Sequence, residues 1–119
     1  MPMSSSFMSW DNPKILESVK RAVSTGRYNI ILHARREMSP ERDDISEKEL
    51  VEAISNGEII EDYHNDKPFP SCLIFGRTEE GRPIHAVCAY SKDDDIAIII
   101  TTYEPDINMW IDYRYRRMV

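Results

Sequence analysis

Apolar positions follow a helical spacing in the first half of this chain and a strand-like spacing in the second. Before Gly26 they recur three and four residues apart and so share one helical face: Ile15, Leu16, Val19, Ala22 and Val23. Asp11-Asn12-Pro13 supplies a capping side chain followed by proline, which is a typical helix start. The pattern predicts a first helix that begins there and ends at Gly26.

The next segment combines an extended stretch, a helical turn and a second helix. Residues 27–32 are predicted to be extended, and residues 34–38 a short helical turn. Ser39-Pro40 ends that turn, because the residue before proline avoids helical backbone angles. Ser46-Glu47-Lys48-Glu49 has the capping-box pattern, which predicts a second main helix ending at Gly57.

After Gly57 the pattern predicts four strands, over residues 59–64, 72–77, 84–90 and 96–103, with turn residues between them. Consecutive strands joined by tight turns favour an antiparallel meander. The predicted class is therefore α+β, with two main N-terminal helices packed on a four-stranded antiparallel sheet. Residues 1–10, which are Ser-rich and without pattern, are predicted to form a flexible tail, and residues 11–119 a single domain.

The charge balance limits the partners that the chain can bind. A net charge of -6 argues against a generic phosphate binder, because non-specific affinity for nucleic acid comes from Lys and Arg. Residues 37–66 carry eleven acids against two bases, whereas residues 114–117 read Arg-Tyr-Arg-Arg. The acidic stretch fits a solvated helix face, and a local positive patch near the C-terminus stays open as an alternative.

Composition also indicates the compartment. No apolar run reaches the roughly 20 residues that span a bilayer, and the N-terminus lacks the pattern of a signal peptide. We therefore expect a cytoplasmic protein without a membrane partner, in which Cys72 and Cys88 are reduced, half-buried thiols. The three histidines are far apart and no nucleotide-binding motif is present, so neither a metal nor a cofactor is expected.

Candidate chemistry centres on two histidines inside predicted elements, His33 and His85. Histidine changes charge near neutral pH, so a cleft that holds it can move protons. A three-residue loop over residues 92–94 would place His85 directly across from Thr101, with Tyr103 on the same face. A loop one residue longer would turn His85 away from both. Gly76 on the other neighbouring strand would leave room for a ligand or for the imidazole.

Each candidate also has a structural interpretation. His85 can pack against a helix and bond to backbone, and His33 can cap a helix while the nearby arginines pair with acids. Alternatively, Arg36 shares a helical face with His33 and its guanidinium binds phosphate. Trp110 either anchors the C-terminal segment or stacks on a nucleobase, and His64 is expected to be exposed.

Several motifs together are similar to a known family. His-Ala at residues 33–34 with an Arg and a Met after it, and Gly-Glu-Ile-Ile-Glu-Asp-Tyr at residues 57–63, resemble the bacterial domain of unknown function 4258 family. Residues 70–76, 82–85 and 100–105 and Trp110 agree with the same pattern. The resemblance runs from about residue 28 to residue 117, with one extra residue between Met38 and Arg42.

The resemblance implies a RelE/barnase-like sheet and a relation to small ribonuclease toxins that cut RNA without metal, often encoded beside a zinc-finger antitoxin. On this chain it implies that His33 and His85 share the acid and base roles, that Arg36 neutralises the phosphate, and that Thr101 and Tyr103 orient it. Substrate binding would fall to the remaining basic and aromatic candidates: Arg35, Arg42, Trp110, Arg114 and Arg116.

The leading hypothesis is thus a metal-independent endoribonuclease of a toxin–antitoxin pair, with RNA and a small zinc-finger antitoxin as partners. A non-catalytic protein-interaction module of the same fold is one alternative. A small-molecule binding domain, in which His85 and Tyr103 line a pocket, is another.

Overall fold

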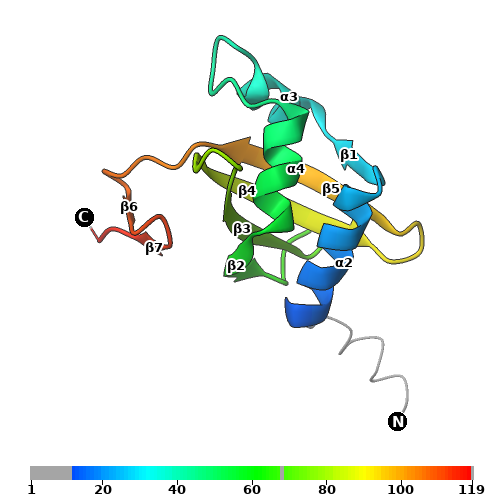
Figure 1. The fold of residues 1–119 in the computed structure, drawn as a ribbon. Helices are drawn as coiled ribbons and strands as arrows, with labels where there is room; N and C mark the ends of the chain where they lie inside the picture. Colours follow the sequence, from blue (N-terminus) through cyan, green and yellow to red (C-terminus); the bar gives the residue numbers. More distant parts are fainter. Residues whose placement is uncertain (1–11, 68, 119) are drawn as a thin grey trace.

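The computed structural model describes residues 12–67 and 69–118, and the tail predicted at residues 1–10 lies outside them. Within the described residues three helices and seven strands form (Figure 1): α2 (Asn12–Ser24), β1 (Tyr28–Ile30), α3 (Leu32–Met38), α4 (Glu47–Ser55), β2 (Glu58–Tyr63), β3 (Ser71–Arg77), β4 (Pro83–Ser91), β5 (Ile96–Tyr103), β6 (Trp110–Ile111) and β7 (Tyr115–Arg116). The α+β class is confirmed, and the predicted helical turn is a short helix, α3.

The predicted helix ends are also confirmed where they rest on described residues. Gly26 follows α2 with a positive φ of 79°, a backbone conformation that glycine adopts without steric cost. At the start of α4, the Ser46 hydroxyl accepts from the Glu49 N–H at 3.0 Å, and the Glu49 carboxylate accepts from the Ser46 N–H at 3.0 Å. This capping box satisfies two backbone donors that a helix leaves unpaired.

The main sheet differs from the prediction, because it has five strands and is mixed. Its strand order is β1-β5-β4-β3-β2, with β1 parallel to β5 and the other neighbours antiparallel. Residues 28–30 were expected to be extended but were not placed in the sheet. Their partner, residues 97–99, lies far along the chain, so local alternation carries no signal of this pairing. A four-stranded antiparallel sheet is therefore wrong for this fold.

The register between β4 and β5 also corrects the prediction. The loop between the paired Ser91 and Ile96 is one residue longer than expected, which alone would turn His85 away from Tyr103. A β-bulge further along the pair shifts the register by one more residue and restores the shared face. As a result His85 lies across from Tyr103, and Thr101 is one pair further along on the same face.

Helices α2 and α4 cover one face of the sheet (Figure 1), and the hydrophobic core lies between them. Gly76 faces this side, where a Cβ would lie 1.7 Å from the Ala53 carbonyl oxygen. It therefore permits the close approach of α4 and does not leave room beside His85, whose partner on β3 is Phe75. No helix of the described residues is long and apolar enough to cross a membrane.

Cys72 and Cys88 lie opposite each other on β3 and β4 and face the same core. Both are free thiols and completely buried, not half-buried as predicted. Burial raises the pKa of Cys72 to about 12, so this thiol stays protonated and unreactive at neutral pH.

Candidate functional site

The face of the sheet opposite the helices carries His85, Thr101 and Tyr103, three of the side chains that the sequence singled out. Side chains alternate along each strand, so the register defines three rows across β2, β3, β4 and β5 on this face. The rows are Glu58, Phe75, His85 and Tyr103; then Glu61, Leu73, Val87 and Thr101; then Tyr63, Ser71, Ala89 and Ile98.

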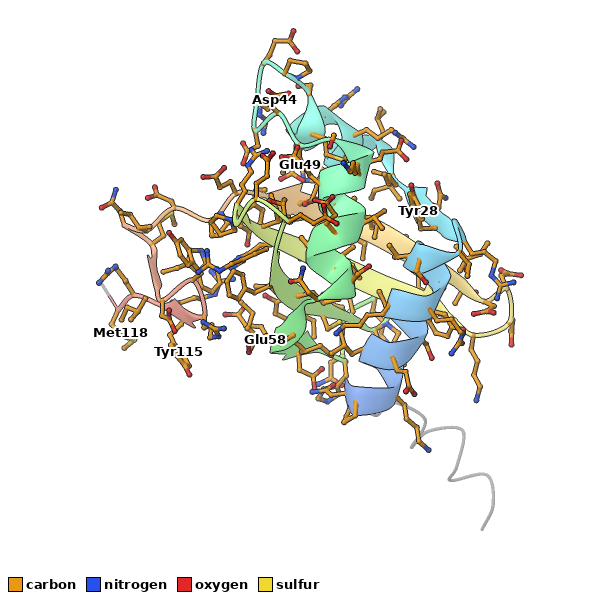
Figure 2. The ribbon with its side chains drawn as sticks, viewed as in Figure 1. Tyr28, Asp44, Glu49, Glu58, Tyr115 and Met118 are labelled. Atoms are coloured by element: carbon orange, nitrogen blue, oxygen red, sulfur yellow. The ribbon has the colours of Figure 1, made fainter. Side chains whose placement is uncertain are left out.

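The C-terminal hairpin of β6 and β7 closes over the first of these rows. Trp110 is buried, and its ring meets the His85 ring edge-on with centroids 4.5 Å apart. The Tyr113 ring stacks on Phe75 at 5.9 Å. Tyr115 and Met118 lie on the far side of the hairpin, exposed and away from the sheet (Figure 2). Trp110 thus anchors the C-terminal segment, as one of its two interpretations predicted.

His85 is completely buried, with 0% of its surface exposed, and both of its ring nitrogens have partners. Nε2 is 2.7 Å from the Tyr113 carbonyl oxygen, which only accepts, so Nε2 carries the proton. Nδ1 then accepts from the Tyr103 hydroxyl at 3.2 Å. Burial lowers the pKa of His85, so the imidazole is neutral at neutral pH. The pocket that His85 and Tyr103 were predicted to line is occupied by Trp110 and Tyr113.

Beside His85 lies an ion pair that the sequence analysis missed. Arg116 on β7 donates to both carboxylate oxygens of Glu61 on β2, from Nε at 2.9 Å and from Nη2 at 3.1 Å. The Tyr63 hydroxyl donates to the same carboxylate. Burial alone would raise the pKa of Glu61, but the hydrogen bonds from Arg116 and Tyr63 outweigh it and lower the pKa. The sequence signal that could have identified Glu61 and Tyr63 was the alternation of polar residues at positions 61 and 63 of a predicted strand.

Trp110 lies between His85 and the ion pair of Glu61 and Arg116. The Arg116 guanidinium lies 4.7 Å from the centre of the Trp110 ring, which also contacts the His85 ring. We call Glu61, Tyr63, His85, Tyr103 and Arg116 the sheet-face cluster. Its accessible groups are the Arg116 side chain, which is 61% exposed, and the partly exposed Glu61 carboxylate. Burial raises the pKa of Tyr103 to about 12, so its hydroxyl keeps its proton at neutral pH.

His33 does not join this cluster. It lies on α3, whose buried residues belong to the core on the helix side of the sheet, and its side chain is 64% exposed. Its Nε2 is 3.6 Å from the Glu37 carboxylate, which accepts from the Thr102 N–H at 3.0 Å. The structure therefore does not bring His33 and His85 together as the acid and base of one site.

The predicted substrate-binding residues fall into two groups. Trp110, Arg114 and Arg116 lie on the hairpin, where Arg114 pairs with Glu58 at 2.9 Å. Arg35, Arg36 and Arg42 lie around α3 instead. Arg35 pairs with Glu47 at 3.1 Å, whereas Arg36 and Arg42 are exposed and form no ion pair within the described residues.

Arg82, in the Arg-Pro-Ile-His motif, has a structural position. It pairs with Glu49 at 3.1 Å and Glu104 at 2.7 Å, and it donates to the backbone carbonyls of Asp43 and Asp44. Asp44 and Glu49 appear close together at the start of α4 (Figure 2). Arg82 thereby ties the beginning of β4 to the loop between α3 and α4.

Comparison with known proteins identifies the family. A family model described as Domain of unknown function (DUF4258) matches residues 30–104, more than half of the chain. The chain belongs to this family. The residues matched by the DUF4258 model include four of the five members of the sheet-face cluster; Arg116 lies outside them. No curated protein and no solved structure matches the chain. Among the described residues, no group of three or more His, Cys, Asp or Glu side chains could hold a metal ion.

Proposed function

We propose that this DUF4258 domain is a metal-independent endoribonuclease, the toxin of a toxin–antitoxin pair, and that the sheet-face cluster is its site. The observation that carries the proposal is the contact of an ionised carboxylate, a guanidinium and a phenol on one sheet face. These are the groups that cleavage of RNA through its 2′-hydroxyl requires: a base, a cation and a proton donor.

The roles follow from charge and accessibility. The Glu61 carboxylate is ionised and partly exposed, so it is the group of the cluster that can accept the proton of the 2′-hydroxyl. Arg116 moves from Glu61 to the phosphate and stabilises the charge that develops there. The O2′–P bond forms while the P–O5′ bond breaks, leaving a 2′,3′-cyclic phosphate. The Tyr63 hydroxyl, which contacts the same carboxylate, gives its proton to the departing 5′-oxygen. Buried His85 holds the hairpin that carries Arg116 in position through its hydrogen bond to the Tyr113 carbonyl.

Local charge supports RNA binding here in spite of the acidic body. Arg77 and Arg117 lie with Arg114 and Arg116 around the hairpin and make no ion pair within the described residues. Tyr115, which is 63% exposed, stands between Arg114 and Arg116 in the sequence. Basic groups interleaved with aromatic rings are typical of surfaces that bind single-stranded nucleic acid. Because Arg114 and Arg116 are paired with carboxylates, Arg77 and Arg117 supply the uncompensated positive charge beside the cluster.

The test is cleavage of end-labelled RNA by the full chain in EDTA. We expect products with 2′,3′-cyclic phosphate ends, and a loss of about 10²-fold or more in Glu61→Gln, the typical effect of removing a general base. Glu58→Gln is the matched control, because Glu58 lies on the same strand and also pairs with a hairpin arginine. Equal activity of both variants, or no cleavage of free or ribosome-bound RNA, would overturn the proposal.

A second candidate is the protein-interaction module. The hairpin segment exposes a row of large apolar side chains, from 46% to 97% of each surface: Ile107, Met109, Ile111, Tyr115 and Met118. Exposed apolar rows of this kind mark protein contacts. If this function holds, Met109→Asp should abolish a complex with a small zinc-finger antitoxin in size-exclusion chromatography. Retention of the complex in that variant would exclude the row as the contact.

A further inference from the structure

A groove on the same face of the sheet lies outside the sheet-face cluster. It has a volume of about 290 Å³ and its floor is formed by apolar side chains of β4 and β5, Val87, Ile98 and Ile100. Ile31 and Phe69 form apolar walls, and 47% of the Phe69 surface is exposed. This volume is at the lower end of the range for ligand pockets, so the groove can hold one planar ring system.

The register places this groove next to the proposed cleavage site. Ser71, which lines it, is the pairing partner of Tyr63, and Val87 is two residues along β4 from His85. Successive residues on one face of a strand are about 7 Å apart. One nucleotide can therefore have its base in the groove while its phosphate lies against Arg116.

Polar groups at the edge of the groove determine which hydrogen-bond donors and acceptors a bound ring must carry. Asp66 and Lys67 lie side by side there, both exposed. The Ser71 hydroxyl donates to Asp66 Oδ2 at 3.3 Å, and the Asp66 N–H donates to the Tyr63 carbonyl at 2.9 Å, so the carboxylate is held at the edge. A carboxylate accepts two hydrogen bonds side by side.

We propose that this groove binds a guanine base of single-stranded RNA, next to the phosphate that is cut; this inference rests on the proposed function. Guanine is the RNA base whose N1–H and amino group present two adjacent donors to a carboxylate such as Asp66. Lys67 can donate to the neighbouring O6, and the exposed Phe69 ring stacks on the base. Adenine, cytosine and uracil place an acceptor where Asp66 requires a donor.

The test measures binding without cleavage. Four short RNA oligonucleotides with 2′-fluoro sugars, which lack the attacking hydroxyl, differ at one position, where they carry guanine, adenine, cytosine or uracil. Their affinity for the full chain is measured by fluorescence anisotropy. We expect guanine to bind about tenfold more tightly than adenine. Asp66→Asn should remove this preference, and Phe69→Ala should weaken guanine binding about tenfold. Asp93→Asn, an exposed acid on the loop after β4, is the control and should bind like wild type.

The outcomes separate this inference from the proposed function. Equal affinity for the four bases, or an unchanged preference in Asp66→Asn, would overturn the guanine site even if RNA is cleaved. Guanine preference that depends on Asp66 would support the site even if no RNA is cleaved, and the ribonuclease proposal alone would then fail. Binding that requires Arg116 but neither Asp66 nor Phe69 would also overturn the groove as a base site.

Discussion

Replacing His85 by alanine should destabilise the fold by about 3–4 kcal/mol. The side chain is completely buried, and its ring contacts those of Phe75, Tyr103 and Trp110. Loss of its two hydrogen bonds contributes about 1 kcal/mol each. The cavity left among the three rings adds about 1–2 kcal/mol, since the hairpin above it closes only in part.

The assay is urea unfolding followed by circular dichroism, with His33→Ala as the matched control. His33 is 64% exposed, and its Nε2 lies 3.6 Å from the Glu37 carboxylate, so its removal should cost about 0.5 kcal/mol or less. In a domain of this size, the His85 variant should also lower the melting temperature by about 10 °C or more. If the two variants unfold at the same urea concentration, His85 is not part of the core that closes the hairpin, and this reasoning is refuted.

Three further predictions concern packing, capping and pH. Gly76→Ala should cost about 3 kcal/mol or more in urea unfolding, because its Cβ would collide with the Ala53 carbonyl; a loss under about 1 kcal/mol would mean that α4 can shift. Ser46→Ala should cost about 1 kcal/mol through loss of the capping box, and Ser46→Asp should restore most of it. Acidification should lower the urea midpoint, because the pKa values of His85 and Glu61 are lower in the folded protein than in the unfolded chain. The unfolded chain therefore binds a proton more readily than the folded protein, at His85 below about pH 6.5 and at Glu61 below about pH 4.5. A midpoint that rises on acidification would contradict both shifts.

Part of the candidate site could be predicted from the sequence, and part could not. His85 and Tyr103 were singled out because polar or aromatic residues within apolar strands are conspicuous, and Arg116 because it belongs to the basic run at residues 114–117. Glu61 and Tyr63 were missed, since a polar residue on a strand next to an acidic stretch is the usual mark of a solvated face. Their importance depends on contact with Arg116, which lies more than 50 residues further along the chain.

Local sequence patterns were sufficient to predict α2 and α4, the helix ends that fall on described residues, and the strands β2 to β5. These depend on local quantities: the period of apolar residues, the capping box at Ser46 and the positive φ available to Gly26. It also determined the family, through motifs spread over the sheet strands.

Three features became evident only in the folded chain: the parallel pairing of β1, the β-bulge that turns His85 toward Tyr103, and the closure of the hairpin over both. Each is a contact between segments far apart in sequence, whose free energy comes from burial and hydrogen bonds that exist only once the sheet has formed. For the same reason His33 and His85 looked equivalent in the sequence, although one is on the surface of a helix and the other is enclosed by aromatic rings.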